Sequence, residues 1–260
     1  MYLTVRAIVL RVSEFNDRDA MLTVLTQNYG KLSIKARGLR RKNSPLAAPC
    51  QLLSFGEFTL FEYNGKYTIN EAHSLELFSG LRRELTQLSL GSYFAQVTEL
   101  ISQEDMPNPE LQSLLLNCLY ALSKLGLPEA QVKAVFELRA ACLAGYTPEL
   151  FGCHVCGCQT PERFDLSQGQ LECKGCRDPQ SAGIRVPVTP EMLEAMRYIC
   201  LCAPKRLFSF RLGEDATQAL SQLTEGYLQT QLERGFGALD FYKSLFVREA
   251  FLGEKHDGIV

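Results

Sequence analysis

Four cysteines in two closely spaced pairs form the most specific chemical pattern in this sequence. They are Cys153, Cys156, Cys173 and Cys176, in the spacing C-x2-C-x16-C-x2-C. Two thiolates two residues apart can reach one tetrahedral ion from a single turn, and two such pairs supply four ligands. The pattern predicts one structural zinc ion (Zn2+). Because four thiolates close the coordination sphere, this metal is not expected to be catalytic.

Other interpretations of these cysteines stay open. The thiols can be buried and reduced or form redox pairs, and Cys158 can replace Cys156 as a ligand, although Cys-x4-Cys is a poorer spacing. His154 is expected to be a bystander. Gly157 and Gly175 are expected to let the backbone turn its amide groups toward the sulfurs. The remaining cysteines are expected to be small core residues: Cys50, Cys118, Cys142, Cys200 and Cys202.

The segments around the cysteines must bring the two pairs together. Between the pairs, apolar residues flank Ser167-Gln168-Gly169-Gln170, which predicts a short hairpin. Before them, apolar residues at spacings of three and four predict helices within 81–103, 111–122 and 128–143, with Gly126 as a C-cap. After them, Thr189-Pro190-Glu191 is typical of a helix start. Helices are expected at about 190–202, 215–234 and 239–251, and a frayed polar tail from residue 253 onward.

Positive charge is concentrated at the N-terminus. The whole chain has a net charge of −2, but residues 1–42 hold nine Lys or Arg against three Asp or Glu. The net charge of this segment is +6, which leaves −8 for the rest of the chain. Because a phosphate backbone responds to a local basic surface, the asymmetry favours nucleic-acid binding by the N-terminal segment.

The first 75 residues predict a β module. Short apolar runs rich in β-branched residues alternate with turn signals, and Asn64-Gly65 is a strong hairpin signal. The expected strands are Thr4–Val12, Ala20–Thr26, Lys31–Arg37, Leu53–Tyr63 and Lys66–Ala72. Five short strands suggest a small barrel of the OB type, with a sandwich fragment as the alternative.

The predicted strand Lys31–Arg37 places three cations on one face, and a segment rich in basic residues follows at 38–45. A basic groove with aromatic residues nearby, such as Phe15 or Tyr67, is how small barrels hold single-stranded nucleic acid. A merely solvated charged face is the alternative. The candidate DNA-binding residues are Arg11, Tyr29, Lys31, Lys35, Arg37, Arg40, Arg41, Lys42 and Tyr63.

Several functional classes lack their sequence signals. The chain has three histidines and no nucleophile elbow, Walker A motif or dinucleotide-binding glycine pattern, so neither catalysis nor a small-molecule substrate is expected. Arg6 and Arg11 interrupt the first apolar stretch, so no signal peptide is predicted, and no run is long enough to span a membrane. Ten cysteines without a secretory signal indicate the reducing cytoplasm.

Cations in the helical part suggest a possible binding surface of another kind. Together with apolar neighbours, they can form a docking site for an acidic tail; solvated helix surfaces are the favoured alternative. These cations are Arg82, Arg83, Lys133, Arg139 and Arg197. A zinc-containing protein-interaction scaffold that does not bind DNA directly is therefore the alternative to a DNA-binding protein.

Taken together, several segments resemble the bacterial recombination mediator RecO family. They are Val9–Asp19, Leu22–Thr26, Tyr29–Leu32, Lys35–Gly38 and Leu143–Leu150, the last leading directly into Cys153-x2-Cys156. The resemblance covers essentially the whole chain, and the N-terminal block and the junction with the cysteines are fairly specific together. Some members of the family lack the full set of cysteines, which this sequence keeps.

The resemblance implies an α+β fold: an OB-fold DNA-binding domain at 1–78 and an all-α domain at 79–260 with a zinc-binding insertion at about 151–180. It implies recombinational repair in the RecF pathway by a protein that binds single- and double-stranded DNA, anneals complementary strands and helps load recombinase onto DNA coated by single-strand-binding protein. The implied partners are RecR and that single-strand-binding protein.

Overall fold

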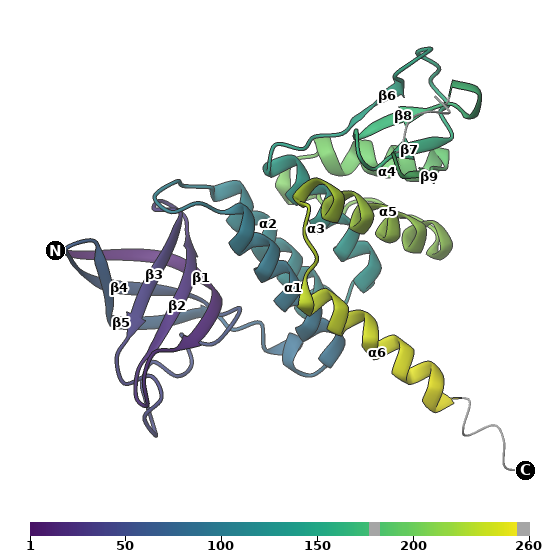
Figure 1. The fold of residues 1–260 in the computed structure, drawn as a ribbon. Helices are drawn as coiled ribbons and strands as arrows, with labels where there is room; N and C mark the ends of the chain where they lie inside the picture. Colours follow the sequence, from purple (N-terminus) through teal and green to yellow (C-terminus); the bar gives the residue numbers. More distant parts are fainter. Residues whose placement is uncertain (177–182, 254–260) are drawn as a thin grey trace, which may run out of the picture. The chain divides into compact units, whose positions relative to one another are not determined.

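The N-terminal strands close into a five-stranded barrel (Figure 1). The computed structural model describes residues 1–176 and 183–253, with side chains up to residue 246. The strands are β1 (Tyr2–Glu14), β2 (Ala20–Thr26), β3 (Lys31–Ala36), β4 (Phe55–Tyr63) and β5 (Lys66–Glu76). They run in the order β1-β2-β3-β5-β4, and β4 pairs with β1 to close the barrel. The predicted barrel of the OB type is confirmed.

Alternating side chains fill this barrel because successive residues of a strand point to opposite faces. Leu32, Ile34 and Ala36 of β3 are buried, as the alternation of the strand predicts. Strands β3 and β5 are neighbours in the barrel and pair in parallel, with Ile34 opposite Tyr67. The predicted hairpin also forms: Tyr63 pairs with Lys66 across Asn64-Gly65, and both turn residues have a positive φ.

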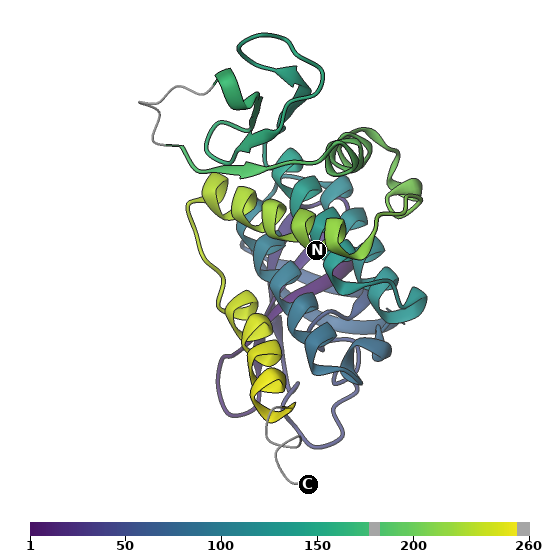
Figure 2. The same cartoon turned by 90° about the vertical axis from the view of Figure 1, so that its right-hand side faces the viewer.

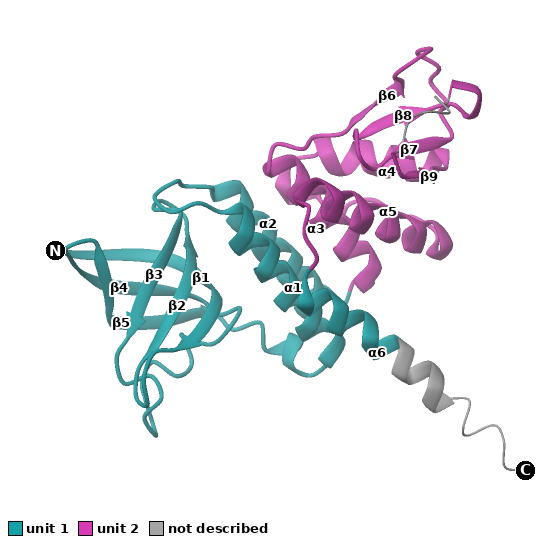
Figure 3. Ribbon diagram, in the orientation of Figure 1, with its two compact units in different colours: residues 1–126, 236–260 teal, residues 127–235 magenta. Residues whose placement is uncertain are grey.

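Several helical elements belong to the same compact unit as the barrel (Figure 3). They are η1 (Ser79–Arg82), α1 (Leu85–Ile101), α2 (Pro109–Tyr120), the π-helical turn η2 (Ala121–Leu125) and α6 (Gly237–Gly253). Helix α1 packs against both β1 and α6. Asn108 caps α2 by accepting a hydrogen bond from the amide of Leu111 at 3.0 Å, and Gly126 ends η2 at φ 61°, as predicted.

The second compact unit, residues 127–235, combines helices with a small sheet (Figures 2 and 3). Its helical elements are α3 (Glu129–Leu143), η3 (Lys174–Cys176), α4 (Pro190–Leu201), η4 (Pro204–Arg206) and α5 (Glu214–Leu232). The strands are β6 (Glu149–Cys153), β7 (Arg163–Asp165), β8 (Gln170–Glu172) and β9 (Arg185–Pro187), in the order β6-β8-β7-β9. We call this sheet and its connections, residues 149–176 and 183–187, the cysteine module.

Local signals explain how the cysteine module joins the helices. The predicted hairpin forms by β7 and β8 around Ser167-Gln168-Gly169. Strand β9 leads into α4 (Figure 2), whose N-cap Thr189 accepts a hydrogen bond from the amide of Met192 at 3.3 Å. Pro190 occupies the first turn, where a missing amide hydrogen costs nothing. The expected helix start is confirmed.

The compact units divide the chain differently from the predicted domains. The boundary at residue 78 follows the last barrel strand, but α1 and α2 pack with the barrel, and the chain returns to this unit from residue 236. The predicted polar tail begins at residue 253, which is the last residue of α6, and its remainder, residues 254–260, lies outside the described residues. The predicted insertion at 151–180 includes residues 177–180, which are not described either.

Within residues 1–176 and 183–253, none of the helices combines the length and the apolar character needed to cross a bilayer.

Candidate metal centre and nucleic-acid interface

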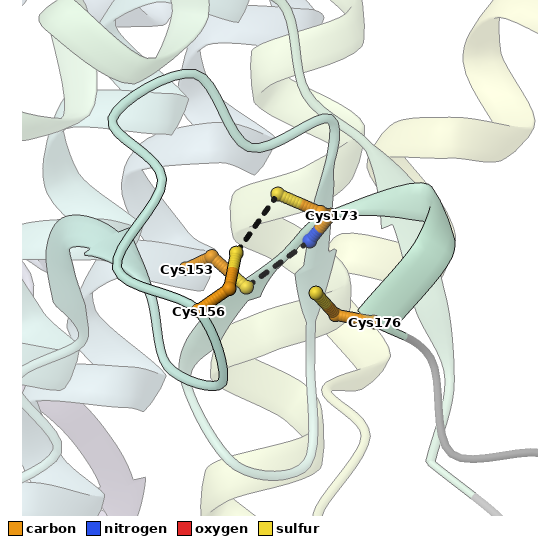
Figure 4. A group of neighbouring side chains, drawn as sticks. All are labelled: Cys153, Cys156, Cys173 and Cys176. Atoms are coloured by element: carbon orange, nitrogen blue, oxygen red, sulfur yellow. Dashed lines mark hydrogen bonds between the residues drawn. The ribbon is translucent and has the colours of Figure 1, made fainter.

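The four predicted cysteines converge at one point of the cysteine module (Figure 4). Cys153 ends β6, Cys156 lies in the turn after it, Cys173 follows β8, and Cys176 ends η3. All four Sγ atoms lie within 4.8 Å of one another. Four thiolates at about 2.3 Å from one tetrahedral ion would be separated by roughly 3.8 Å. The distance between Sγ of Cys156 and Sγ of Cys173 is 3.8 Å, so the residues fit one metal ion.

Pairing between two short strands brings these thiols together. Strands β6 and β8 run in parallel, and the amide of His154 donates to the carbonyl of Leu171 at 2.9 Å. The amide of Cys173, from the second pair, donates to Sγ of Cys153 in the first pair at 3.3 Å. Gly157 has the expected positive φ of 71°. Gly175 does not have a positive φ, and the helical turn η3 carries the second pair.

The local environment shifts the pKa values of two thiols of the cluster in opposite directions. Burial raises the pKa of Cys153, but the amides of Cys156, Cys173 and Val155 donate to its sulfur and lower the pKa to about 6. A hydrogen bond with Cys156 and burial raise the pKa of Cys176 to about 11. Thiols this close cannot all ionise without a cation among them, whereas a divalent metal deprotonates them. The donor set is therefore suited to a metal ion.

Cys158 and His154 adjoin the four-cysteine cluster without belonging to it, and the thiol of Cys158 forms a hydrogen bond with that of Cys173. Cys156, rather than Cys158, joins the four; Sγ of Cys158 lies 3.5 Å from the hydroxyl of Thr160. His154 is likewise not part of the cluster, since its Nε2 lies 3.2 Å from Oε1 of Glu172. The expectation that His154 is a bystander agrees with this geometry.

A buried network of charged side chains joins strands β7, β8 and β9 of the cysteine module. Sequence reasoning did not predict it. Arg185 on β9 donates from Nε to Glu172 on β8 at 2.6 Å and lies 3.3 Å from Asp165 on β7. The hydrogen bond from Arg185 lowers the pKa of Glu172 despite burial. All three side chains are buried to about 95% or more. Their spacing in the sequence carries no motif, because three different strands supply them.

The predicted cations of the barrel have different environments. Arg11 and Lys31 are held by α1: Nε of Arg11 donates to the carboxylate of Glu99 at 2.9 Å, and Nζ of Lys31 donates to the carbonyl of Glu99 at 2.9 Å. Lys35 pairs with Asp19 at 3.3 Å, and Arg40 pairs with Glu14 at 2.8 Å. These four cations have partners within the protein.

The other three predicted cations are exposed. Among the residues that the structure describes, none forms an ion pair with Arg37, Arg41 or Lys42. We call residues 37–42 the basic loop. Arg18, in the β1–β2 turn, is likewise exposed, and its carbonyl accepts a hydrogen bond from the amide of Arg40 at 3.1 Å. Sequence reasoning did not select Arg18, which stands between two aspartates.

Asp19 fixes the basic loop to the β1–β2 turn. Its Oδ1 accepts a hydrogen bond from the amide of Gly38 at 2.9 Å, and Gly38 has a positive φ of 68°. This backbone hydrogen bond, followed by those of Asn16 and Lys35, holds the pKa of Asp19 below its ordinary value. The two turns therefore form one structure at one end of the barrel.

The predicted tyrosines lie at the other end of the barrel. Tyr29 is in the β2–β3 turn, and Tyr63 ends β4, whereas the basic loop follows the opposite end of β3. Both tyrosine side chains are exposed. The aromatic side chain beside the basic loop is Phe15, which is 56% exposed and whose ring centroid lies 4.3 Å from Nζ of Lys35.

Several of the cations suggested for an acidic-tail site have partners within their own unit. Lys133 is buried on α3, where Nζ contacts Glu137 at 2.9 Å and Glu225 at 2.8 Å. Nη1 of Arg139 donates to the carbonyls of Ile199 and Cys200, and Arg82 donates to the carbonyls of Leu77 and Leu52. Helix packing thus uses Lys133, Arg139 and Arg82 internally, whereas Arg197 lines a groove beside α4.

Both parts of the chain match models of one protein family. Residues 1–78 match the model described as "Recombination protein O N terminal", and residues 82–240 match "Recombination protein O C terminal". Curated proteins named "DNA repair protein RecO" are similar over most of their length. That of Acetivibrio thermocellus is 30% identical, covering 94% of this chain and 97% of its own. That of Bacillus subtilis is 26% identical, covering 85% and 86%.

Proposed function

Because the chain belongs to the recombination protein O family of DNA repair proteins, we propose that it is a non-enzymatic, DNA-binding recombination mediator. It binds single- and double-stranded DNA, anneals complementary strands and helps load recombinase onto DNA coated by single-strand-binding protein. Its partners are RecR and single-strand-binding protein, and it acts in the cytoplasm, at the nucleoid during repair. Catalysis and a small-molecule substrate form no part of the proposal.

The observation that carries this proposal is the exposed basic end of the barrel. Arg18, Arg37, Arg41 and Lys42 are exposed, and Asp19 joins the segments that carry them. Phosphate contacts from such side chains make binding strong at low salt and weak at high salt. The exposed ring of Phe15 is available to stack on a base, which contributes about 1–3 kcal/mol where it occurs.

The anchored residues have a second role in this proposal. Lys35 and Arg40 neutralise Asp19 and Glu14 beside the loop, so that fewer negative charges face the DNA. Arg11 is still exposed beside Glu99, while Lys31 is half-buried. Tyr29 and Tyr63 contact DNA only if the strand continues across the barrel to the opposite end. The affinity of the Tyr63→Ala variant for oligonucleotides of increasing length distinguishes a DNA path confined to the basic end from one that crosses the barrel.

Charge reversal in the basic loop tests the DNA interface. Binding of a labelled single-stranded oligonucleotide is followed by fluorescence anisotropy at increasing salt. We expect severalfold weaker binding when Arg37, Arg41 and Lys42 are all changed to Glu. The matched control is Lys66→Glu, which reverses an exposed charge in the hairpin at the other end of the barrel. Equal binding by the triple variant would move the interface elsewhere.

The same measurement distinguishes the alternative function. A zinc-containing interaction scaffold without direct DNA binding predicts no anisotropy change with the wild-type chain, even at low salt. A DNA-binding mediator predicts a change that declines steeply as salt is added. An annealing assay with complementary strands then tests the mediator activity itself.

We also propose that the four-cysteine cluster holds one structural zinc ion. Thiolate ligands in a tetrahedral arrangement suit zinc, and all four positions are occupied by protein. The ligands would be Cys153, Cys156, Cys173 and Cys176, and the ion would tie β6 to β8 and η3. Elemental analysis of the purified chain should find about one zinc per chain. A folded, metal-free chain of equal stability would contradict the proposal.

A groove beside α4 supports docking of the acidic tail of single-strand-binding protein. It has a volume of about 1180 Å³ and is lined by Arg197, Arg206, Arg211, Tyr198 and Phe210, together with the acids Glu191 and Glu194. Arg206 and Arg211 are exposed. We expect their joint change to Glu to weaken capture of single-strand-binding protein. Arg234→Glu, an exposed change on the same unit, is the control, and equal capture by both variants would exclude this groove.

A further inference from the structure

Two thiols outside the four-cysteine cluster lie side by side in the second unit. Cys142 is in the last turn of α3 and Cys200 is in the last turn of α4, 58 positions apart in the sequence. Their Sγ atoms are 3.7 Å apart, and both residues are half-buried. Neither is fully buried, so the expectation that both are small core residues is confirmed only in part. Cys50 and Cys118, in contrast, are fully buried, as expected.

Contacts other than the thiols hold these two helix ends together. Arg139, one turn before Cys142, donates from Nη1 to the carbonyls of Ile199 and Cys200. The end of α3 is closed by a hydrogen bond from the amide of Tyr146 to the carbonyl of Ala141 at 2.9 Å. Tyr227 on α5 donates to the carbonyl of Tyr146 at 3.1 Å. The two thiols are thus positioned by the fold before any reaction between them.

The surroundings give the two thiols different chemical properties. The hydrogen bond with Cys200, helped by Thr147 and the charge of Arg139, outweighs burial and lowers the pKa of Cys142 to about 7. The same hydrogen bond and burial raise the pKa of Cys200. A thiolate beside a retained thiol is the arrangement of an attacking and a resolving cysteine.

We propose that Cys142 and Cys200 form a reversible thiol–disulfide switch that reacts with hydroperoxides and clamps the end of α3 to the end of α4. The Cys142 thiolate attacks the peroxide, so that an S–O bond forms, the O–O bond breaks, and hydroxide or alkoxide leaves and takes up a proton. Cys200 then attacks the sulfenic sulfur; an S–S bond forms, the S–O bond breaks and water leaves. Two thiols are oxidised and one peroxide is reduced.

The position of this pair in the chain gives the disulfide a structural consequence. The cysteine module lies between α3 and α4 in the sequence. A bond from Cys142 to Cys200 closes a covalent loop that contains the whole module. Closing a long loop stabilises a protein mainly by restricting its unfolded chain. The oxidised protein keeps the helices that frame the module joined even if the four-cysteine cluster is oxidised or loses its metal.

Peptide mapping of the full chain tests the switch. The reduced, zinc-loaded protein is freed of reductant and treated with increasing hydrogen peroxide. The remaining thiols are then alkylated and the peptides are analysed without reduction. We expect a linked pair of peptides that joins Cys142 to Cys200, disappears on adding dithiothreitol, and raises the thermal unfolding midpoint by several degrees.

Variants assign the roles of the two thiols. Cys202→Ser is the matched control, since it removes a half-buried thiol two positions from Cys200 and should leave the linked pair unchanged. Cys142→Ser and Cys200→Ser should both abolish it. In Cys200→Ser, a sulfenic-acid trap such as dimedone should label Cys142, because the resolving thiol is gone.

Two results would overturn the proposal. One is that Cys142 and Cys200 are both recovered alkylated at peroxide concentrations that already oxidise the four-cysteine cluster. The other is that Cys200 is joined to a different cysteine. Both outcomes are measured on the wild-type chain, so they test the proposal even if a variant fails to fold.

Discussion

The cysteine module brings four thiols to one point, whereas the barrel distributes seven predicted cations among several environments. In the module, each ligand pair is fixed by one tight turn, and pairing of β6 with β8 brings the pairs together. In the barrel, neighbours in sequence have different partners: Lys35 and Arg40 are bound to acids, while Arg37 and Arg41 are exposed. Side chains that share a metal must converge, whereas those that share a phosphate backbone need only remain exposed.

Loss of one cysteine ligand should give the largest effect, and it tests whether the four thiols of the cysteine module share one metal ion. We expect Cys173→Ser to lose zinc and to unfold the cysteine module, because structural zinc binding contributes about 10–16 kcal/mol of apparent free energy in small zinc domains. Elemental analysis and thermal unfolding measure both effects. Cys158→Ser is the control, since Cys158 lies outside the cluster. Loss of zinc in the control as well would mean that the ligand set is wrong.

Removal of one buried cation should have the next largest effect. Arg185→Met leaves Glu172 and Asp165 buried without their cation, which typically costs about 3–5 kcal/mol of unfolding free energy. Arg41→Met should change stability by no more than about 0.5 kcal/mol, because Arg41 is exposed. Urea unfolding compares the two variants. Similar values for both would contradict the distinction between embedded and exposed arginines.

Release of the basic loop should have a moderate effect that depends on pH. The pKa of Asp19 is lowered in the folded state, so its contribution to stability is present above its unfolded pKa and is lost as pH falls through the folded value. We expect Asp19→Ala to weaken DNA binding and to lower the unfolding midpoint at pH 7, with the difference in midpoint declining below about pH 4. Asp17→Ala, an exposed neighbour, is the control. An unchanged affinity in Asp19→Ala would show that the loop keeps its structure without this anchor.

A single exposed cation should have the smallest effect. If Arg41 contacts one phosphate, Arg41→Gln should reduce the slope of log affinity against log salt by about one and weaken binding only slightly. Anisotropy titrations at several salt concentrations measure this slope. Lys66→Gln should leave it unchanged. Equal slopes for Arg41→Gln and the wild-type chain would remove Arg41 from the interface.

The difference between the two regions also explains what could be predicted. The cysteine spacing specifies the four-cysteine cluster almost completely, because the geometry of one tetrahedral ion restricts how the ligands are spaced. The charge density of residues 1–42 indicates a basic surface, but it does not indicate which of the cations have partners within the protein. Glu99, which binds Arg11 and Lys31, comes from α1, far along the sequence. No local pattern reveals that contact.

The sequence by itself determined the elements with strong local signals. The alternation of Lys31–Ala36, the Asn64-Gly65 turn and the Thr189-Pro190 cap each act within a few residues, and all three appear in the structure. The two pairs of cysteines belong to the same class, since each pair lies in one turn.

Only the tertiary structure decided which side chains meet across the chain. It buries Lys133 between Glu137 and Glu225, joins Arg185 to two acids, and places Cys142 beside Cys200. The last of these pairs changes the interpretation of two apparently inert core cysteines. Packing between helices and strands sets these contacts, and packing depends on surfaces that distant segments of the chain build together.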